Sequence, residues 1–197
     1  MFTGIIKHLG EVVDISVQGN NKTFTIQSEL AQYVTIDQSV SHNGICLTVE
    51  TTKDSTHYTV TAIHETLQLT TAHEWKIGSK LNLETAARMD SLLDGHIVQG
   101  HVDSVGQITD IANEEGSYRV TISFDKKHAP LVISKGSICI DGVSLTVIQP
   151  TMDSFQVAII PYTWDHTVFH TYQKGTNVNL EFDIIGKYIL RNQELSK

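Results

Sequence analysis

Hydrophobic and polar residues alternate one by one along several short stretches of the chain. The clearest stretches are rich in β-branched and aromatic side chains and cover residues 23–26, 57–61, 80–84, 118–124 and 177–182. Alternation with a period of two predicts strands that bury one face. The dipeptides Asn43-Gly44 and Asp141-Gly142 predict tight turns, because both residue types tolerate positive φ. The pattern therefore indicates an all-β protein, built as small closed barrels or as a sandwich.

The same pattern occurs twice. Residues 43–49 read Asn-Gly-Ile-Cys-Leu-Thr-Val, and residues 141–147, which lie 98 positions later, read Asp-Gly-Val-Ser-Leu-Thr-Val. Residues 76–84 resemble residues 174–181 at an offset of 97. A repeat that fills half of the chain is too long for a solenoid unit. It predicts two tandem homologous domains, and closing each one into a barrel removes unpaired strand edges.

The end of the chain follows a helical pattern. Beyond Ile184, the apolar residues Ile185, Tyr188 and Ile189 recur at helical spacing and are followed by polar residues. A short amphipathic helix is stabilised mainly by what it packs against. Either the barrel or the same helix of another copy could cover this apolar face.

Composition and charge narrow the classes of function. The formal net charge is −8 at pH 7 and no basic stripe is present, so we expect no binding to nucleic acids. No stretch has the roughly 20 apolar residues of a spanning helix, and the N-terminus lacks a secretory pattern. Cys46 and Cys139 are therefore expected to be free thiols. These features predict a cytoplasmic protein that does not bind membranes.

Small hydroxyl and thiol side chains recur at one position of the repeat. Cys46 and Thr48 point to one face of a predicted strand, as do Ser144 and Thr146 in the second half. Such groups suit hydrogen bonding to a planar heterocycle, although Thr is common in strands and Cys is often a small core residue. Their recurrence favours two similar binding pockets, while duplicated packing is the alternative explanation.

Two histidines, His96 and His101, stand where the second half begins. Histidine can move protons near neutral pH. Their spacing of five differs from the i, i+4 pair of a helical zinc site, and no set of acidic or cysteine ligands completes one, so no metal is expected. Glycine motifs for nucleotides are absent, and residues 142–145 do not complete a hydrolase Gly-x-Ser-x-Gly elbow.

Five segments together resemble the riboflavin synthases, a family of lumazine-binding proteins. They are residues 1–6 (Met-Phe-Thr-Gly-Ile-Ile), 43–49, 95–103 (Gly-His-Ile-Val-Gln-Gly-His-Val-Asp), 140–147 and 160–163 (Ile-Pro-Tyr-Thr). These segments span nearly the whole chain in the family's order. The resemblance implies two tandem homologous Greek-key β-barrels, over residues 1–95 and 96–184, and a short C-terminal α-helix over residues 185–197.

The resemblance also implies an activity. Riboflavin synthases convert two molecules of 6,7-dimethyl-8-ribityllumazine into riboflavin and 5-amino-6-ribitylaminouracil by moving a four-carbon unit between two stacked lumazines. They need no cofactor and no metal. The resemblance further implies a homotrimer in which the N-terminal barrel of one subunit faces the C-terminal barrel of a neighbour. The sequence leaves open whether the chain associates with a lumazine synthase shell.

Position by position, the resemblance implies a set of site residues. Those associated with activity are His101, as a proton shuttle, and Cys46, Ser144, Asp141, Phe2 and Ser39. Those expected to bind one lumazine are Cys46, Leu47, Thr48, Thr61, Ala62, Ile63, His64, Glu65 and Thr66. Those expected to bind the other are Ser144, Leu145, Thr146, Ile159, Ile160, Pro161, Tyr162, Thr163, Trp164 and Lys135. Those expected to line the pockets are Gly4, Ile5, Ile6, Gly100, His101 and Val102.

The chain departs from the family pattern in two places. Asp94-Gly95 replaces a common Gly-Gly pair, and residues 162–164 read Tyr-Thr-Trp where Glu-Thr-Leu or His-Thr-Leu is usual. The second departure predicts altered contacts in the C-terminal pocket. The alternative function is that of a fluorescent antenna protein, which has the same fold and binds its chromophore without turnover. Such proteins tend to lose the polar residues that this chain keeps at Cys46, Thr48 and His101, so the enzyme is favoured.

Overall fold

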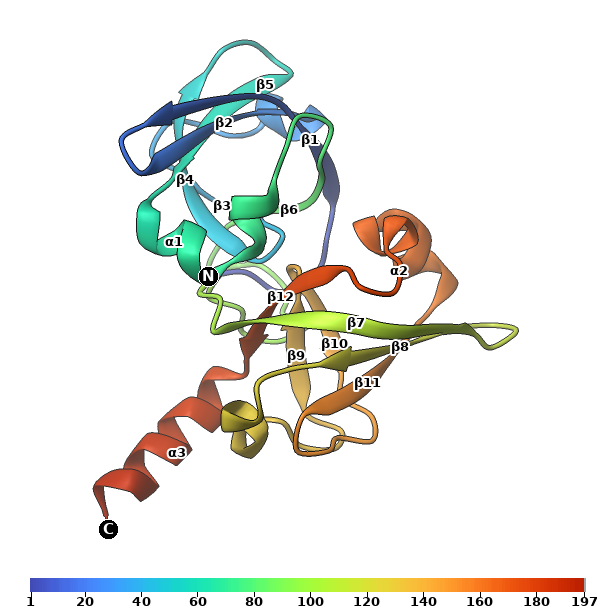
Figure 1. Ribbon diagram of the computed structural model, residues 1–197. Coiled ribbons are helices and arrows are strands. Elements are labelled where there is room, and N and C mark those ends of the chain that lie inside the picture. Colours follow the sequence, from blue (N-terminus) through green and yellow to red (C-terminus); the bar gives the residue numbers. More distant parts are fainter. Residues whose placement is uncertain (197) are drawn as a thin grey trace.

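Two antiparallel barrels, one formed by each half of the chain, make up the body of the molecule (Figure 1). The computed structural model describes residues 1–196. In the N-terminal half the strands pair in the order β1-β2-β5-β4-β3-β6 and close. These strands are β1 (His8–Gln18), β2 (Asn21–Gln27), β3 (Ser39–His42), β4 (Ile45–Thr52), β5 (His57–Ala62) and β6 (Lys80–Thr85). Strand β6 returns beside β3 after three consecutive strands, which is a Greek-key connection.

The C-terminal half repeats this arrangement in the order β10-β9-β12-β7-β8-β11. Its strands are β7 (Ser104–Asn113), β8 (Tyr118–Ser123), β9 (Ser137–Ile140), β10 (Val143–Thr146), β11 (Ser154–Ile159) and β12 (Asn177–Phe182). The last gap is bridged by a single isolated pairing between Ile148 and Gln156, so this barrel is nearly closed. The predicted all-β class with two tandem barrels is confirmed.

The strands predicted from the alternation and the turns predicted from the two dipeptides are found at the expected positions. The five alternating stretches fall in β2, β5, β6, β8 and β12, with residue 124 of the fourth stretch lying just beyond β8. Asn43 and Gly44 have φ of 47° and 77°, and Asp141 and Gly142 have φ of 45° and 83°. Both dipeptides therefore use the positive φ for which such residues are suited.

Short helices that the sequence pattern did not reveal follow corresponding strands. These are α1 (His64–Leu69) and α2 (Pro161–His166), and the 3₁₀ turns η1 (Glu29–Gln32), η2 (Thr71–Glu74), η3 (Lys126–Leu131) and η4 (Val168–Thr171). Helices of six residues are too short to show a clear helical period. Pro161 at the first position of α2 is a local signal that could have found it, because proline is preorganised for a helix start.

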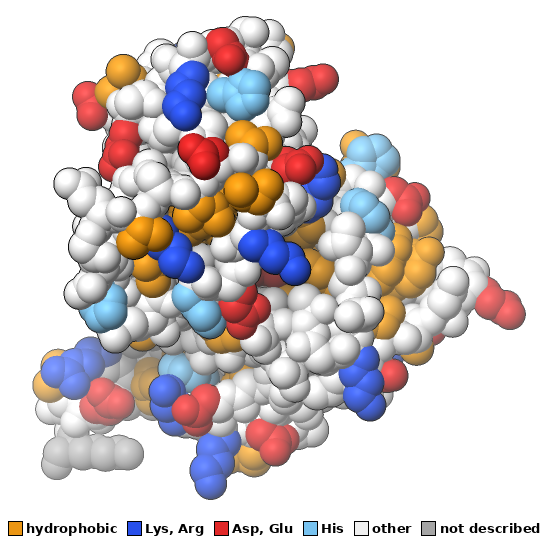
Figure 2. All heavy atoms as spheres, turned by 45° about the horizontal axis from the view of Figure 1, so that its top comes forward, with side chains coloured by type: hydrophobic (Ala, Val, Ile, Leu, Met, Phe, Trp, Pro, Cys, Tyr) orange, Lys and Arg blue, Asp and Glu red, His pale blue; other side chains and the backbone are white. Residues whose placement is uncertain are grey.

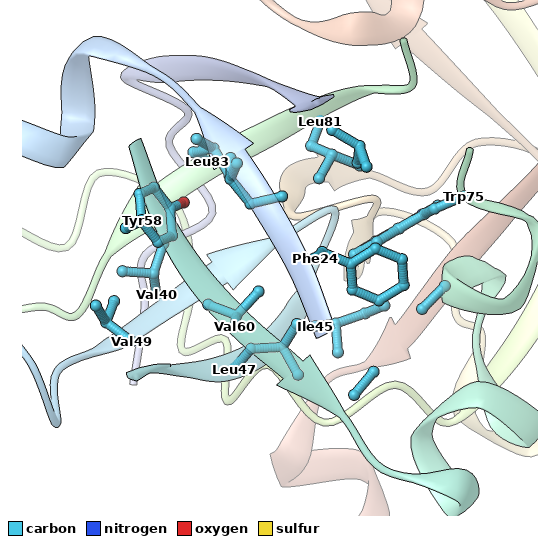
Figure 3. Packing of buried hydrophobic residues seen from close by; sticks show 14 of the residues in the cluster. Phe24, Val40, Ile45, Leu47, Val49, Tyr58, Val60, Trp75, Leu81 and Leu83 are labelled. Atoms are coloured by element: carbon cyan, nitrogen blue, oxygen red, sulfur yellow. The ribbon is translucent and has the colours of Figure 1, made fainter. Parts of the chain in front are cut away.

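The N-terminal barrel encloses a large cluster of buried hydrophobic residues (Figure 3). Phe24 meets Trp75 edge to face, with ring centroids 5.0 Å apart. His42 and Tyr58 are both fully buried, and the Nε2 atom of His42 lies 2.9 Å from the Tyr58 hydroxyl. The Nδ1 atom of the same ring is 3.0 Å from the Val40 carbonyl. Burial lowers the pKa of His42 to about 4, so the ring is neutral inside the barrel.

Helix α3 (Ile184–Leu195) extends away from the C-terminal barrel (Figure 1). The Asp183 side chain caps its start by accepting from Ile185 N, and Lys187 forms an ion pair with Asp103. No residue of α3 is buried in the chain. The predicted C-terminal helix is present, and Lys197, at the end of its predicted range, lies outside the described residues.

The N-terminal end of the chain lies between the two barrels (Figure 1). Phe2 pairs with Val98 in an isolated antiparallel bridge, and both side chains are buried together with that of Cys139. The two segments that lead into the barrels therefore lie side by side and run in opposite directions. The predicted boundary between residues 95 and 96 falls in the second of these segments and stays a prediction.

The surface mixes charges of both signs. On the face shown in Figure 2, acidic and basic side chains are interspersed with hydrophobic ones. Among residues 1–196, no helix is both long and apolar enough to cross a membrane.

Candidate functional site

Two pockets, one on each half, are built from matching residues. The first has a volume of about 210 Å³ and is lined by Ile45, Cys46, Glu65, Thr66, Leu69, Thr70, Gly100, His101 and Val102. The second has a volume of about 90 Å³ and is lined by Val143, Ser144, Tyr162, Thr163, His166, Thr167, Gly4, Ile5 and Ile6. Every residue of one set has its counterpart in the other, 96 to 98 positions away. We call them the N-terminal pocket and the C-terminal pocket.

Each pocket takes one wall from a segment outside its own barrel. The first residues of the chain line the C-terminal pocket, and the segment that leads into the C-terminal barrel lines the N-terminal pocket. Main-chain hydrogen bonds hold both segments: Cys46 N donates to Gly100 O at 2.9 Å, and Ser144 N donates to Gly4 O at 2.8 Å. Each pocket is therefore completed by a segment that does not belong to its own barrel. We call these two segments, residues 3–6 and 99–102, the exchanged segments.

Glycine is required where these segments meet the barrels. Gly4 and Gly100 have φ of +78° and +81°, a region that residues with a Cβ rarely adopt. A Cβ on Gly4 would lie 2.6 Å from the Cβ of Ser144, and one on Gly100 would lie 2.5 Å from the Cβ of Cys46. The close approach of the main chain depends on both glycines.

Two buried glutamates fix the exchanged segments. Glu84 accepts hydrogen bonds from the main-chain N–H groups of Thr3 and Gly4, at 2.7 and 3.0 Å. Glu181 does the same for Gln99, Gly100 and His101, at 2.6 to 2.9 Å. Burial raises the pKa of both carboxyl groups, and the hydrogen bonds that they accept offset this rise only in part. Sequence reasoning missed both glutamates, although they occupy the same position of the repeat.

Four of the matched pairs differ in the chemical character of the side chain, beyond an exchange of one aliphatic residue for another. The pairs are Cys46 with Ser144, Glu65 with Tyr162, Leu69 with His166, and His101 with Ile5. In the C-terminal pocket Tyr162 and His166 stack with ring centroids 4.0 Å apart, and His166 Nδ1 lies 2.8 Å from the Tyr162 carbonyl. This aromatic wall has no equivalent in the N-terminal pocket, as the unusual sequence at residues 162–164 predicts.

A histidine contacts the hydroxyl of Ser144 at the C-terminal pocket. His96 Nδ1 lies 2.6 Å from Ser144 Oγ, and the His96 side chain is buried. Burial lowers the pKa of His96, while the nearby Asp183 raises it. A neutral imidazole at this distance can accept the hydroxyl proton. His96 precedes the region that the repeat matches, so the N-terminal pocket has no counterpart of this pair.

The N-terminal pocket brings together the two residues that were expected to act there. Cys46 is partly buried and His101 is exposed at the rim, and both line the pocket. Only the main chain of His101 is held in place, by Glu181. The imidazole can therefore turn toward a bound molecule, which suits the predicted role in proton transfer.

Three other residues expected to affect activity lie outside both pockets. Phe2 is buried between the barrels, where a Cβ on Gly100 would contact its ring at 2.9 Å. Ser39 lies in β3 opposite Thr48. Asp141 is 1% exposed, and its carboxylate accepts from Tyr172 Oη at 2.5 Å and from the main-chain N–H of Asn179 at 2.8 Å. Burial raises the pKa of Asp141 to about 7. Their roles in catalysis stay predictions.

Some of the residues that were expected to contact a ligand line a pocket, and others do not. Those that line a pocket are Gly4, Ile5, Ile6, Cys46, Glu65, Thr66, Gly100, His101, Val102, Ser144, Tyr162 and Thr163. Those that do not line either pocket are Leu47, Thr48, Thr61, Ala62, Ile63, His64, Leu145, Thr146, Ile159, Ile160, Pro161, Trp164 and Lys135. Of these, Leu47, Ala62 and Ile159 belong to the barrel cores, and Trp164 stacks on Tyr118 at 3.9 Å. Whether the rest touch a ligand stays a prediction.

No metal centre is formed within residues 1–196. These residues contain no cluster of three or more His, Cys, Asp or Glu side chains that could hold a metal ion. Both cysteines are free, with Cys139 buried and Cys46 partly buried. The side chains that line the pockets include hydroxyl, thiol, imidazole and carboxyl groups.

Comparison with known proteins defines the class to which this fold and these pockets belong. The family profile of the lumazine binding domain matches the chain twice, over residues 3–86 and 99–183. The chain is thus a protein with two tandem lumazine-binding domains. The riboflavin synthase of Actinobacillus pleuropneumoniae is 41% identical over 190 residues, which cover 96% of this chain and 88% of that protein. The chain belongs to the riboflavin synthase family.

A second riboflavin synthase and a solved structure are also similar to this chain. The riboflavin synthase of Bacillus subtilis (strain 168) is 37% identical and covers 97% of this chain and 89% of its own length. Among solved structures, the crystal structure of LumP complexed with riboflavin has a TM-score of 0.86 at 26% identity, covering 92% of this chain and 99% of that chain.

Proposed function

We propose that this chain catalyses the dismutation of two molecules of 6,7-dimethyl-8-ribityllumazine to riboflavin and 5-amino-6-ribitylaminouracil. The observation that carries the proposal is the correspondence of two pockets, residue for residue, in a chain of the riboflavin synthase family. A reaction between two copies of one substrate needs two sites for the same heterocycle. A four-carbon unit leaves one lumazine and joins the other, so no external oxidant or reductant takes part.

The differences between the pockets support unequal roles for the two substrate molecules. Holding two rings in a reactive orientation supplies much of the rate of such a reaction. A proton must also leave a methyl group of one substrate, and we assign this transfer to His101. At the C-terminal pocket, His96 accepts the proton of Ser144 and makes that oxygen a better nucleophile or hydrogen-bond acceptor.

The exposed face of α3 supports assembly into a homotrimer. Ile185, Tyr188 and Ile189 are 61%, 74% and 55% exposed, although an apolar helix face is stable only when it is covered. Contact between copies would allow an N-terminal pocket to face a C-terminal pocket of a neighbouring subunit. Sedimentation of the purified protein tests this, and co-sedimentation with lumazine synthase tests the association that the sequence leaves open. We place the protein in the cytoplasm, as the sequence predicts.

The test of activity uses the purified chain and 6,7-dimethyl-8-ribityllumazine, without added metal or nucleotide. We expect one riboflavin for every two lumazines consumed, over many turnovers, measured by absorbance and chromatography. Lumazine that stays unchanged would refute the proposed activity.

The alternative function is a chromophore-binding protein like LumP, whose crystal structure contains riboflavin. The higher identity to riboflavin synthases, 41% against 26%, favours the enzyme. A tight fluorescent complex that gives no product in the same assay would favour the alternative.

A further inference from the structure

A ring of four buried polar residues lies where the two barrels meet. Asn43 and Asp141 begin the turns between β3 and β4 and between β9 and β10, and Asn82 and Asn179 lie in β6 and β12. Their exposed fractions are 6%, 1%, 0% and 1%, respectively. A buried polar group without a hydrogen-bond partner is costly, so the partners of these four residues must be identified.

The hydrogen bonds close the ring through both barrels. Within each barrel the turn binds the neighbouring strand: Asn43 Oδ1 accepts from Asn82 N at 2.6 Å, and Asp141 Oδ1 accepts from Asn179 N at 2.8 Å. Between barrels the asparagine side chains cross over. Asn82 Nδ2 donates to Asp141 O, and Asn179 Nδ2 donates to Asn43 O, each at 2.8 Å.

The side-chain oxygens of the two asparagines also cross between the barrels. Asn82 Oδ1 accepts from Val168 N at 2.9 Å, and Asn179 Oδ1 accepts from Thr71 N at 2.8 Å. The amide group of each asparagine thus binds two main-chain groups of the opposite barrel, a carbonyl with its nitrogen and an N–H with its oxygen. An amide group suits this role because it carries donors and an acceptor side by side.

The groups that Asn82 binds lie next to two segments that line the C-terminal pocket. Asp141 precedes the pocket residue Ser144 by three positions, and Val168 directly follows the pocket residue Thr167. Asn82 therefore ties the β9–β10 turn to the end of α2, although it belongs to the N-terminal barrel.

Asn179 makes the equivalent connection at the N-terminal pocket. Asn43 precedes the pocket residue Cys46 by three positions, and Thr71 directly follows the pocket residue Thr70. Neither Asn82 nor Asn179 lines a pocket, so neither is in a position to touch the ligand.

We propose that Asn82 and Asn179 are reciprocal positioning residues, each of which sets the geometry of the ligand pocket in the barrel to which it does not belong. The proposal rests on the proposed function, because it takes both pockets to bind the lumazine or flavin ring. Removal of either amide leaves a buried carbonyl and a buried N–H without partners. The turn and the helix end that carry them then separate, and the pocket between them loses its shape.

The variants Asn82→Ala and Asn179→Ala form a matched pair in the full-length protein. Each is titrated with riboflavin while backbone amide signals are followed by NMR, Gly4 and Ile5 for the C-terminal pocket and Gly100 and His101 for the N-terminal pocket. We expect Asn82→Ala to weaken binding at the C-terminal pocket about tenfold, with less than about a twofold change at the N-terminal pocket. Asn179→Ala should give the reverse.

The outcomes separate this proposal from the proposed function. Riboflavin that shifts no pocket signal in the unaltered protein overturns ligand binding, and both proposals with it. Binding in the unaltered protein, followed by an equal loss at both pockets or a loss only in the variant's own barrel, overturns the positioning role alone. A merely structural role predicts such an equal loss, since the two variants should lower the urea midpoint similarly. If the alanine variants do not fold, Asn82→Ser and Asn179→Ser replace them and are judged by the same criterion.

Discussion

Replacement of Gly100 by alanine adds one methyl group at a crowded point of the N-terminal pocket. The new Cβ would lie 2.5 Å from the Cβ of Cys46 and 2.9 Å from both Cys46 N and the ring of Phe2. The residue would also have to keep a φ of +81°. The left-handed backbone costs about 1–2 kcal/mol for a residue with a Cβ, and overpacking adds about 1–3 kcal/mol. We therefore expect Gly100→Ala to lower the free energy of unfolding by about 2–5 kcal/mol.

Gly19 provides the matched control for the cost of the backbone alone. It lies in the turn between β1 and β2 with a φ of +61°, and a Cβ there would meet no heavy atom within 4 Å. Gly19→Ala should therefore cost only about 1–2 kcal/mol. The difference between the two variants measures the close approach of Gly100 to Cys46.

Urea unfolding of both variants measures this difference, and riboflavin titration adds a functional readout. Gly100→Ala should also weaken binding at the N-terminal pocket, because the hydrogen bond from Cys46 N to Gly100 O must lengthen. If the two variants lose the same free energy of unfolding, the pocket wall yields without cost, and the argument from close packing is refuted.

Three further predictions concern titratable groups. The pKa of His42 falls to about 4 in the folded chain, so acid favours the unfolded state, and between about pH 6.5 and 4 each unit should cost about 1.4 kcal/mol of unfolding free energy; urea unfolding of His42→Gln should lose this slope. The pKa of Asp141 rises to about 7, so its contribution to stability is complete below about pH 4 and is lost as the pH rises through 7; Asp141→Asn should be more stable than the parent at alkaline pH, and thermal unfolding that shows no gain would contradict the burial argument. His101→Gln and His96→Gln should each lower kcat by about 10²-fold or more with a much smaller change in lumazine affinity; steady-state turnover that stays unchanged would remove the residue from the mechanism.

Much of the fold could be read from local patterns. The alternating stretches predict β2, β5, β6, β8 and β12, and the Asx-Gly dipeptides predict both positive-φ turns. These features depend on neighbouring residues, whose sterics and one-sided burial act over a few positions. Helices α1 and α2 were missed because six residues leave too little periodicity, and tertiary packing rather than propensity stabilises them.

Only part of the candidate site could be predicted from the sequence. Recurrence in the repeat pointed to Cys46 and Ser144, and both line pockets. The repeat gave no sign that His96 contacts Ser144. The two residues are 48 positions apart, and His96 has no counterpart in the first half of the chain. The resemblance associates Asp141 with activity, and only the structure shows that its carboxylate accepts a hydrogen bond from Tyr172.

Sequence alone therefore determined the class of this protein, because strand period and duplication are written in the order of residues. The tertiary structure decided how the duplicated halves exchange their pocket walls and how Asn82 and Asn179 reach across. These contacts join residues 59 and 136 positions apart, and neither partner carries a local mark of the other. Which of many buried asparagine, glutamate or histidine groups meet depends on the path of the chain, and only the folded path brings their donors and acceptors within hydrogen-bond distance.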